Sequence, residues 1–307
     1  MSYGLLVAPM VVQAQAAGAT RVLLVSGLSG EPRFATAFHA AASALYDAAK
    51  TRWGVADSNL VYLAEDPALD PRRIRGRATR DNLAAAFGEL ARNSAPGDVV
   101  LVLLLGHGSG QGLESRLGLP GTDATAADFA SWLKPLAGRT LVLVNSASGS
   151  GDFLAALADS DRVVITATKS AFERNETTFA AYFARGLSSG EADADKDERV
   201  TVLEAFQFAR REVARGYESR NVLLTEHAQL SDSSLAKRVG FGTAPVPSDP
   251  RIAALYAERR TLEGQVEALR RKKGALDSLA YERELTRLLL ELANKTAELR
   301  AAEARKP

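Results

Sequence analysis

The stretch that decides the fold is residues 99–110, VVLVLLLGHGSG, in which seven aliphatic residues run directly into a glycine-flanked histidine. A second stretch, residues 141–153, reads LVLVNSASGSGDF and has the same form, because an aliphatic run again ends in small polar residues. Strands that are apolar on both faces are typical of a parallel sheet covered by helices. The two stretches therefore predict central strands over Val99–Leu105 and Leu141–Val144.

Shorter aliphatic runs alternate with helical patterns over the rest of the first 240 residues. Three further strands are expected, at Arg21–Val25, Leu60–Leu63 and Val163–Thr166. Helices are expected at Phe34–Arg52, Arg80–Arg92, Ala126–Leu136, Asp152–Ala158 and Val202–Arg215, with another that begins after Thr177 and a turn at Gly186–Gly190. Strands that alternate with helices predict a doubly wound α/β domain, which we place at residues 19–243.

The loops after the two central strands hold the residues that can carry chemistry. Carboxyl ends of adjacent parallel strands share one crevice, so His107 and Ser146 are expected to face one another there. The glycines beside the histidine would let backbone N–H groups approach a substrate carbonyl as an oxyanion hole. Two alternatives remain open: His107 is only a turn residue, or the Ser-Gly loop holds a phosphate at a helix start.

These stretches resemble a known family. LVLLLGHGSG resembles the strand and His-Gly of legumain-like and caspase-like peptidases, and LVLVNSASGSGDF resembles the strand and Ala-Cys-Glu-Ser-Gly-Ser of legumain. Matching Ser148-Gly149-Ser150 to that Ser-Gly-Ser puts Ser146 at the position of the family's cysteine. Thr166-Ala167-Thr168 and Glu176-Thr177-Thr178 resemble its Thr-Ala-x and Glu-Ser-Ser segments. The resemblance implies a caspase-like parallel-sheet α/β/α sandwich over roughly residues 21–230.

The resemblance also implies roles for the site residues. His107 would be the base, Ser146 the nucleophile and Gly108 part of the oxyanion hole. The residues implied to bind substrate are Ser148, Glu176, Thr177 and Thr178. The chain contains no cysteine, however, and a serine hydroxyl is far less acidic than a thiol, whose pKa is about 8.5.

A serine nucleophile needs a base that a third group holds in place, and the sequence offers no assured aspartate partner for His107. Our leading hypothesis is therefore a catalytically impaired, legumain-like protein that binds peptides or assembles protein partners. Two rival hypotheses are an active hydrolase that uses Ser146 with His107, and an inert domain on an oligomeric scaffold.

An acidic loop at residues 193–204 has the spacing of an EF-hand calcium loop. Its expected ligands are Asp193, Asp195, Asp197, the Arg199 carbonyl, Thr201 and Glu204. Glu198 occupies the place where the sharp turn prefers glycine. The alternative is an acidic turn that caps the following helix. Apart from this calcium loop, no required cofactor is expected.

The C-terminal part of the chain changes in composition. Prolines make residues 244–250 a stiff linker, and residues 251–305 are rich in leucine, alanine, glutamate and arginine. Leucines recur every seven residues, at Leu255, Leu262, Leu269 and Leu276 and again at Leu285, Leu292 and Leu299. This pattern predicts a coiled coil that joins copies of the chain. It would be one helix of roughly 80 Å or, with a turn at Lys272-Lys273-Gly274, a helical hairpin. The alternative is a helix packed on its own domain.

The N-terminus and the charge balance bear on location and partners. Residues 1–18 contain a short apolar run and the small-x-small pattern Ala14-Gln15-Ala16, which predicts an exported protein, periplasmic or secreted. The positive start of a signal peptide is missing, so a cytoplasmic protein is the alternative.

The formal net charge of +1 favours neither nucleic acid nor anionic lipid as a partner. The apolar run is too short for stable membrane insertion.

Overall fold

A computed structural model describes residues 18–194, 199–242, 249–271, 273 and 277–303. The chain divides into two compact units, Met1–Thr243 and Ala244–Pro307. The expected leader lies outside the described residues except for Gly18, and so do linker residues 244–248. Within the described ranges, no helix combines the length and the apolar character that crossing a bilayer requires.

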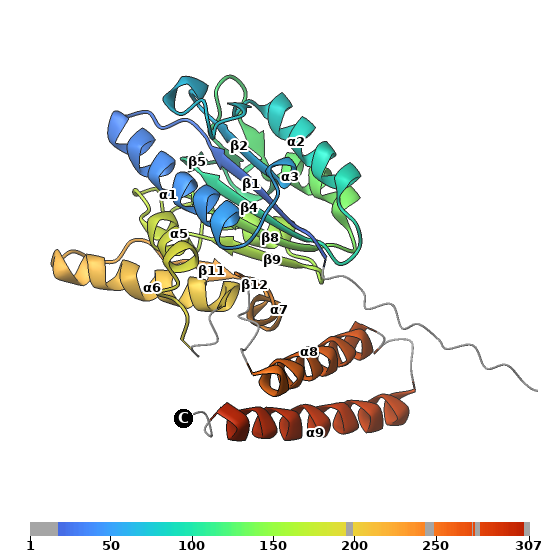
Figure 1. Cartoon of the computed structure of the whole chain (residues 1–307). Coiled ribbons are helices and arrows are strands. Elements are labelled where there is room, and N and C mark those ends of the chain that lie inside the picture. The colour runs from blue at the N-terminus through green and yellow to red at the C-terminus, as the bar shows by residue number, and fades with distance from the viewer. Residues whose placement is uncertain (1–17, 195–198, 243–248, 272, 274–276, 304–307) are drawn as a thin grey trace, which may run out of the picture. The chain divides into compact units, whose positions relative to one another are not determined.

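A central sheet forms the middle of the first unit (Figure 1). In the described part of the chain it has seven strands in the order β11-β9-β8-β4-β1-β2-β3, and only β11 runs antiparallel to its neighbour. The strands are β1 (Thr20–Ser26), β2 (Leu60–Ala64), β3 (Gly76–Arg77), β4 (Val99–Leu105), β8 (Thr140–Asn145), β9 (Arg162–Thr166) and β11 (Gln229–Leu230). Two small sheets contain β5 (Gly108–Ser109), β6 (Arg116–Leu117) and β7 (Ala124–Thr125), and β10 (Val200–Thr201) and β12 (Gly240–Phe241).

Helices cover both faces of the central sheet (Figure 1). One face carries α1 (Pro32–Thr51), α5 (Phe179–Ser189), α6 (Val202–Ser219) and α7 (Ser233–Arg238). The other carries α2 (Arg80–Asn93), α3 (Ala126–Leu133) and α4 (Asp152–Leu157). Short 3-10 turns occur at Asp57–Asn59, Pro67–Leu69, Gly112–Glu114 and Lys134–Leu136.

The strands are continuously aliphatic because each face of the sheet has its own core. In β4, Leu101 and Leu103 pack with the α1 side, whereas Val100 and Val102 pack with the α2 side. A strand buried on both faces must be apolar at every position. The predicted parallel-sheet α/β/α sandwich is therefore confirmed.

One expected turn is wrong. Gly186 lies inside α5, which continues to Ser189 and ends at Gly190 in the left-handed conformation, with φ 83°. A β-carbon on Gly186 would lie 3.0 Å from the Phe208 ring of α6 and 3.1 Å from the Ala192 side chain. Gly186 therefore allows two helices to pack closely, and Gly190 is the residue that ends the helix.

The second unit consists of α8 (Pro250–Arg271) and α9 (Ser278–Glu303). The two helices pack on each other through a core of Val266, Leu269, Tyr281 and Leu288. Near their other ends, Lys295 Nζ lies 2.7 Å from Glu258 Oε2. These pairings make an antiparallel hairpin rather than one long helix. Of the expected turn, Lys272 and Gly274 lie outside the described residues.

Candidate functional site

The candidate site lies where β4 and β8 end. The two strands are parallel neighbours, with Leu104 opposite Asn145. His107 follows the end of β4 and Ser146 follows the end of β8, so both lie at the carboxyl edge of the sheet. This edge is where open α/β sheets bind their ligands.

The imidazole of His107 is held from two sides. Its Nε2 lies 3.1 Å from the backbone oxygen of Ser29. The ring of Phe34 meets the imidazole edge-on with centroids 4.7 Å apart, and the ring of Phe38 lies 5.7 Å away. Because a carbonyl only accepts, this contact assigns the proton of the neutral imidazole to Nε2 and leaves Nδ1 as an acceptor. An imidazole oriented in this way has the form of a general base.

The loop that supplies the Ser29 carbonyl is itself fixed. The backbone N–H and the hydroxyl of Ser29 donate to Glu65 Oε2, at 2.9 and 2.7 Å. Gly27 donates its N–H to the Leu105 carbonyl at 2.8 Å, and a β-carbon on Gly27 would lie 2.3 Å from the Gly118 oxygen. Only glycine fits there, so the loop after β1 passes close to the chain after β4.

The hydroxyl of Ser146 points into the sheet. The side chain is 3% exposed, and its Oγ donates to the backbone oxygen of Leu104 at 2.7 Å. The Ser146 N–H donates to the same oxygen at 2.9 Å. On its other side, Thr177 Oγ1 donates to the Ser146 oxygen at 2.6 Å. The hydroxyl proton is thus bonded to a strand carbonyl.

Backbone N–H groups next to Ser146 are also bonded within the protein. Their acceptors are Asn145 Oδ1 for Ala147 at 3.1 Å, the Glu173 oxygen for Gly149 at 2.7 Å and Thr168 Oγ1 for Gly151 at 3.0 Å. The Gly108 N–H faces Ser148 Oγ at 3.5 Å. A β-carbon on Gly108 would lie 2.4 Å from the Ser148 oxygen, so this glycine allows the two loops to approach.

The residues implied to bind substrate are partly brought together. Ser148 and Thr177 lie beside Gly108 and Ser146 through the contacts given above. Glu176 is exposed and pairs with Arg33 of α1, with Nη1 and Oε2 3.1 Å apart. Thr178 has a different environment, because its hydroxyl donates to Glu226 Oε2 at 3.0 Å.

Glu226 is a buried carboxylate that caps α5. It is 3% exposed and accepts the N–H of Thr178 at 2.9 Å and that of Phe179 at 2.7 Å. Burial raises the pKa of this carboxyl, and the hydrogen bonds oppose that rise. A carboxylate at a helix N-terminus satisfies otherwise free N–H groups, so Glu226 fixes the segment that carries Thr177.

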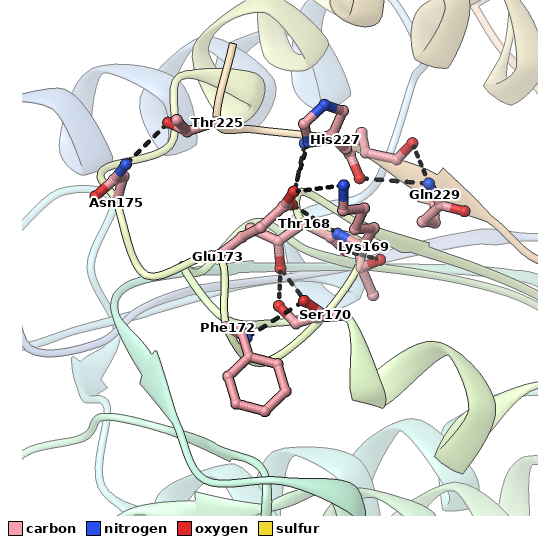
Figure 2. Close-up of polar contacts among 12 residues, drawn as sticks. Thr168, Lys169, Ser170, Phe172, Glu173, Asn175, Thr225, His227 and Gln229 are labelled. Carbon is pink, nitrogen blue, oxygen red and sulfur yellow. Dashed lines mark hydrogen bonds and ion pairs between the residues drawn. The ribbon is translucent and has the colours of Figure 1, made fainter. Parts of the chain in front are cut away.

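A second carboxylate ties the β9–α5 loop to the chain that leads into β11 (Figure 2). Glu173 Oε1 lies 2.5 Å from His227 Nδ1, and Glu173 Oε2 accepts the Lys169 N–H at 2.9 Å. Burial alone would raise the pKa of the Glu173 carboxyl, but the bonds from Lys169 and His227 outweigh it and the net pKa is lowered. The pair gives His227 a structural contact.

The expected calcium loop is only partly described, because Asp195 and Asp197 lie outside the described residues. Glu204 is engaged in a capping box, in which its Oε2 accepts the N–H and the hydroxyl of Thr201, both at 2.8 Å. Its Oε1 accepts the Ala194 N–H at 3.0 Å. Within the described segments, no cluster of three or more metal-ligating side chains occurs. Calcium binding thus stays a prediction.

Several site residues had no usable signal in the sequence. Ser29 acts through its backbone oxygen, which every residue carries. Phe34 belongs to an ordinary helical pattern, and Glu173 and His227 are 54 residues apart. These two residues, far apart in the sequence, come together because β11 lies antiparallel beside β9.

A known protein family matches the part of the chain that holds the candidate site. The family described as Peptidase C13 matches residues 79–240, which is more than half of the chain. None of the curated proteins matches the chain. Among solved structures, a structural-genomics target protein from Geobacter sulfurreducens is similar at 15% identity and a TM-score of 0.45. The match covers 74% of this chain and 98% of that one.

Proposed function

This chain belongs to the Peptidase C13 family, and from that premise we propose that its first unit binds peptides without cleaving them at ordinary enzyme rates. The peptide would lie across the carboxyl edge of the sheet, between His107 and the segment that carries Thr177. Asparagine- or aspartate-containing peptides are the class to test, because the site resembles that of legumain.

The observation that carries this proposal is the environment of Ser146. A nucleophilic hydroxyl must give its proton to a base as it attacks. The Ser146 hydroxyl instead donates to Leu104 inside the sheet and is almost fully buried. Releasing it would leave a buried polar contact unmade, which costs about 1–3 kcal/mol.

The state of the neighbouring donors supports the same conclusion. An oxyanion hole needs N–H groups that are free to meet a developing negative charge. The N–H groups of Ser146, Ala147 and Gly149 already have acceptors within the protein. A peptide bound there would therefore not meet these three donors, and the remaining candidate, the Gly108 N–H, faces Ser148 Oγ at 3.5 Å.

Binding and turnover of one asparagine-centred peptide test the proposal together. Fluorescence anisotropy of the labelled peptide should give saturable binding, and mass spectrometry of the same samples should show it intact. Turnover at roughly 1 s⁻¹ or faster, a common enzyme rate, would refute the impaired function. Failure to bind any peptide of this class would refute the peptide-binding function.

One observation favours the rival function of an active serine hydrolase. His107 already has a fixed orientation and an acceptor nitrogen, which a serine nucleophile would require. A serine-directed phosphonate should then label Ser146, and His107→Ala should abolish the labelling. Absence of labelling between neutral and mildly alkaline pH would exclude this function.

We also propose that the α8–α9 hairpin joins copies of the chain. Three leucines of α9, Leu279, Leu289 and Leu290, are exposed although the helix already packs on α8. A second hairpin could cover them and complete a four-helix bundle. Light scattering tests this assembly. Ending the chain at Pro245 should lower the measured mass to that of a monomer. If the truncated chain keeps the same number of copies as the full chain, the hairpin is not the element that joins them.

A further inference from the structure

Phe172 is an exposed aromatic residue in the loop between β9 and α5. Its side chain is 73% exposed, although phenylalanine is usually buried. Figure 2 shows its ring pointing away from the pair of Glu173 and His227, which lies on the other side of the same loop. The loop therefore presents an apolar ring outward while its next residue is anchored inward.

The loop around Phe172 is ordered by polar contacts. The Phe172 N–H donates to Ser170 Oγ at 3.3 Å, and Asn175 Nδ2 donates to Thr225 Oγ1 at 3.0 Å. The Glu173 carboxylate joins Lys169 to His227 at the centre of the loop. A ligand that contacts this loop would not have to order it, so little binding free energy would be lost to entropy.

The same loop contacts the Ser-Gly turn that follows Ser146. The Glu173 oxygen accepts the Gly149 N–H at 2.7 Å, and a β-carbon on Gly149 would lie 3.2 Å from the Ala171 oxygen. Phe172 is thus held next to the Ser-Gly turn that follows Ser146. A peptide that lies along this edge of the sheet and extends past the turn would reach the loop that carries Phe172.

We propose that Phe172 is a specificity-determining residue that selects peptides with an apolar side chain beside the residue held in the crevice. Glu173 and His227 are positioning residues that keep the ring at the crevice. A rigid aromatic side chain on an ordered loop is the type of residue that dominates binding at interfaces. This inference rests on the proposed peptide-binding function and deepens it.

Affinities for two kinds of peptide test the specificity. The first is an asparagine-centred peptide with serine at every flanking position. In each peptide of the second kind, one of these serines, up to three positions on either side of the asparagine, is replaced by leucine. In the full chain, leucine at one position should improve the Kd about tenfold, since a partly buried leucine contributes on that scale. Phe172→Ala should remove this preference and leave the affinity for the serine peptide unchanged.

Leu69→Ala is the matched control, because it removes another exposed apolar side chain, in the Pro67–Leu69 turn of the same unit. It should change neither affinity. Glu173→Gln should reduce the leucine preference to about threefold or less, while circular dichroism shows an intact fold. In the double variant with Phe172→Ala, Glu173→Gln should have no further effect on the preference, because both changes act through the same ring. If Glu173 had a purely structural role, Glu173→Gln would lower the affinity for both kinds of peptide equally.

The outcomes separate this inference from the function on which it rests. If the full chain binds none of the peptides, both are overturned. If it binds all of them equally, or if the leucine preference survives Phe172→Ala, only this inference is overturned. If Phe172→Ala instead lowers the mass measured by light scattering, the ring contacts a second copy of the chain rather than a peptide, and this inference is overturned.

Discussion

His107 and Ser146 follow neighbouring strands, but their surroundings differ in kind. Around His107, the Ser29 carbonyl and the Phe34 ring fix the imidazole and leave one nitrogen available. Around Ser146, the hydroxyl and the N–H both donate to Leu104. The imidazole is thus oriented with one nitrogen available, whereas the hydroxyl is bonded within the sheet.

This difference shows which half of a catalytic pair depends on residue type. Orientation of an imidazole needs a carbonyl and apolar neighbours, and the fold provides both. A nucleophile needs a side chain that is reactive in its place, and a hydroxyl in a buried position is better satisfied by the nearest carbonyl. The orientation of the imidazole can therefore follow from the fold, whereas reactivity at position 146 depends on the side chain there.

Introducing a thiol at position 146 should give the largest effect. In Ser146→Cys the thiol is only a weak donor, so it holds the Leu104 carbonyl less firmly than the hydroxyl does. It is also far more acidic than a hydroxyl and can use the oriented His107. Cleavage of an asparagine-centred peptide should rise by roughly 10²-fold or more over the wild-type protein, the scale of one positioned base.

Ser148→Cys provides the comparison for that experiment, because Ser148 is equally buried and lies two residues away. It should stay inactive, and adding His107→Ala to Ser146→Cys should remove the gained activity. A folded, peptide-binding Ser146→Cys protein without cleavage would mean that His107 and position 146 do not cooperate.

Removing the Glu226 carboxylate should have the next largest effect, on stability. Glu226→Ala leaves the Thr178 and Phe179 N–H groups without their acceptor, so the free energy of unfolding should fall by about 3 kcal/mol. Urea unfolding measures it. Glu176→Ala is the control, since this glutamate of the same segment is exposed and should change stability by less than about 0.5 kcal/mol. A loss below about 1 kcal/mol for Glu226→Ala would mean that water replaces the cap.

The sequence predicts the sheet well and the site only in part. The aliphatic runs at Val99–Leu105 and Leu141–Val144 specify central strands because both of their faces are buried, and the order of strand ends then brings two loops together. The direction of the Ser146 hydroxyl depends on a side-chain rotamer, which residue identity does not fix. Gly186 was misleading because glycine serves close packing as well as turns.

The smallest predicted effect concerns Tyr62, which contacts the end of β1, just before the loop that supplies the Ser29 carbonyl. Its hydroxyl lies 3.1 Å from Ser26 Oγ at the end of β1, and burial raises its pKa to about 12. The raised pKa means that the neutral phenol stabilises the fold below about pH 10, the ordinary tyrosine value, and that this contribution is lost as the pH rises toward 12.

Between pH 9 and pH 11 the wild-type protein should lose about 1.4 kcal/mol more than Tyr62→Phe, since at pH 11 the unfolded tyrosine is ionised and the folded one is not. Urea unfolding of both proteins across this range measures the difference, which should stay constant between pH 7 and pH 9. Loss of the Ser26 contact shifts the variant equally at every pH, so it does not affect the slope. Parallel pH profiles would mean that the phenol reaches water in the folded protein.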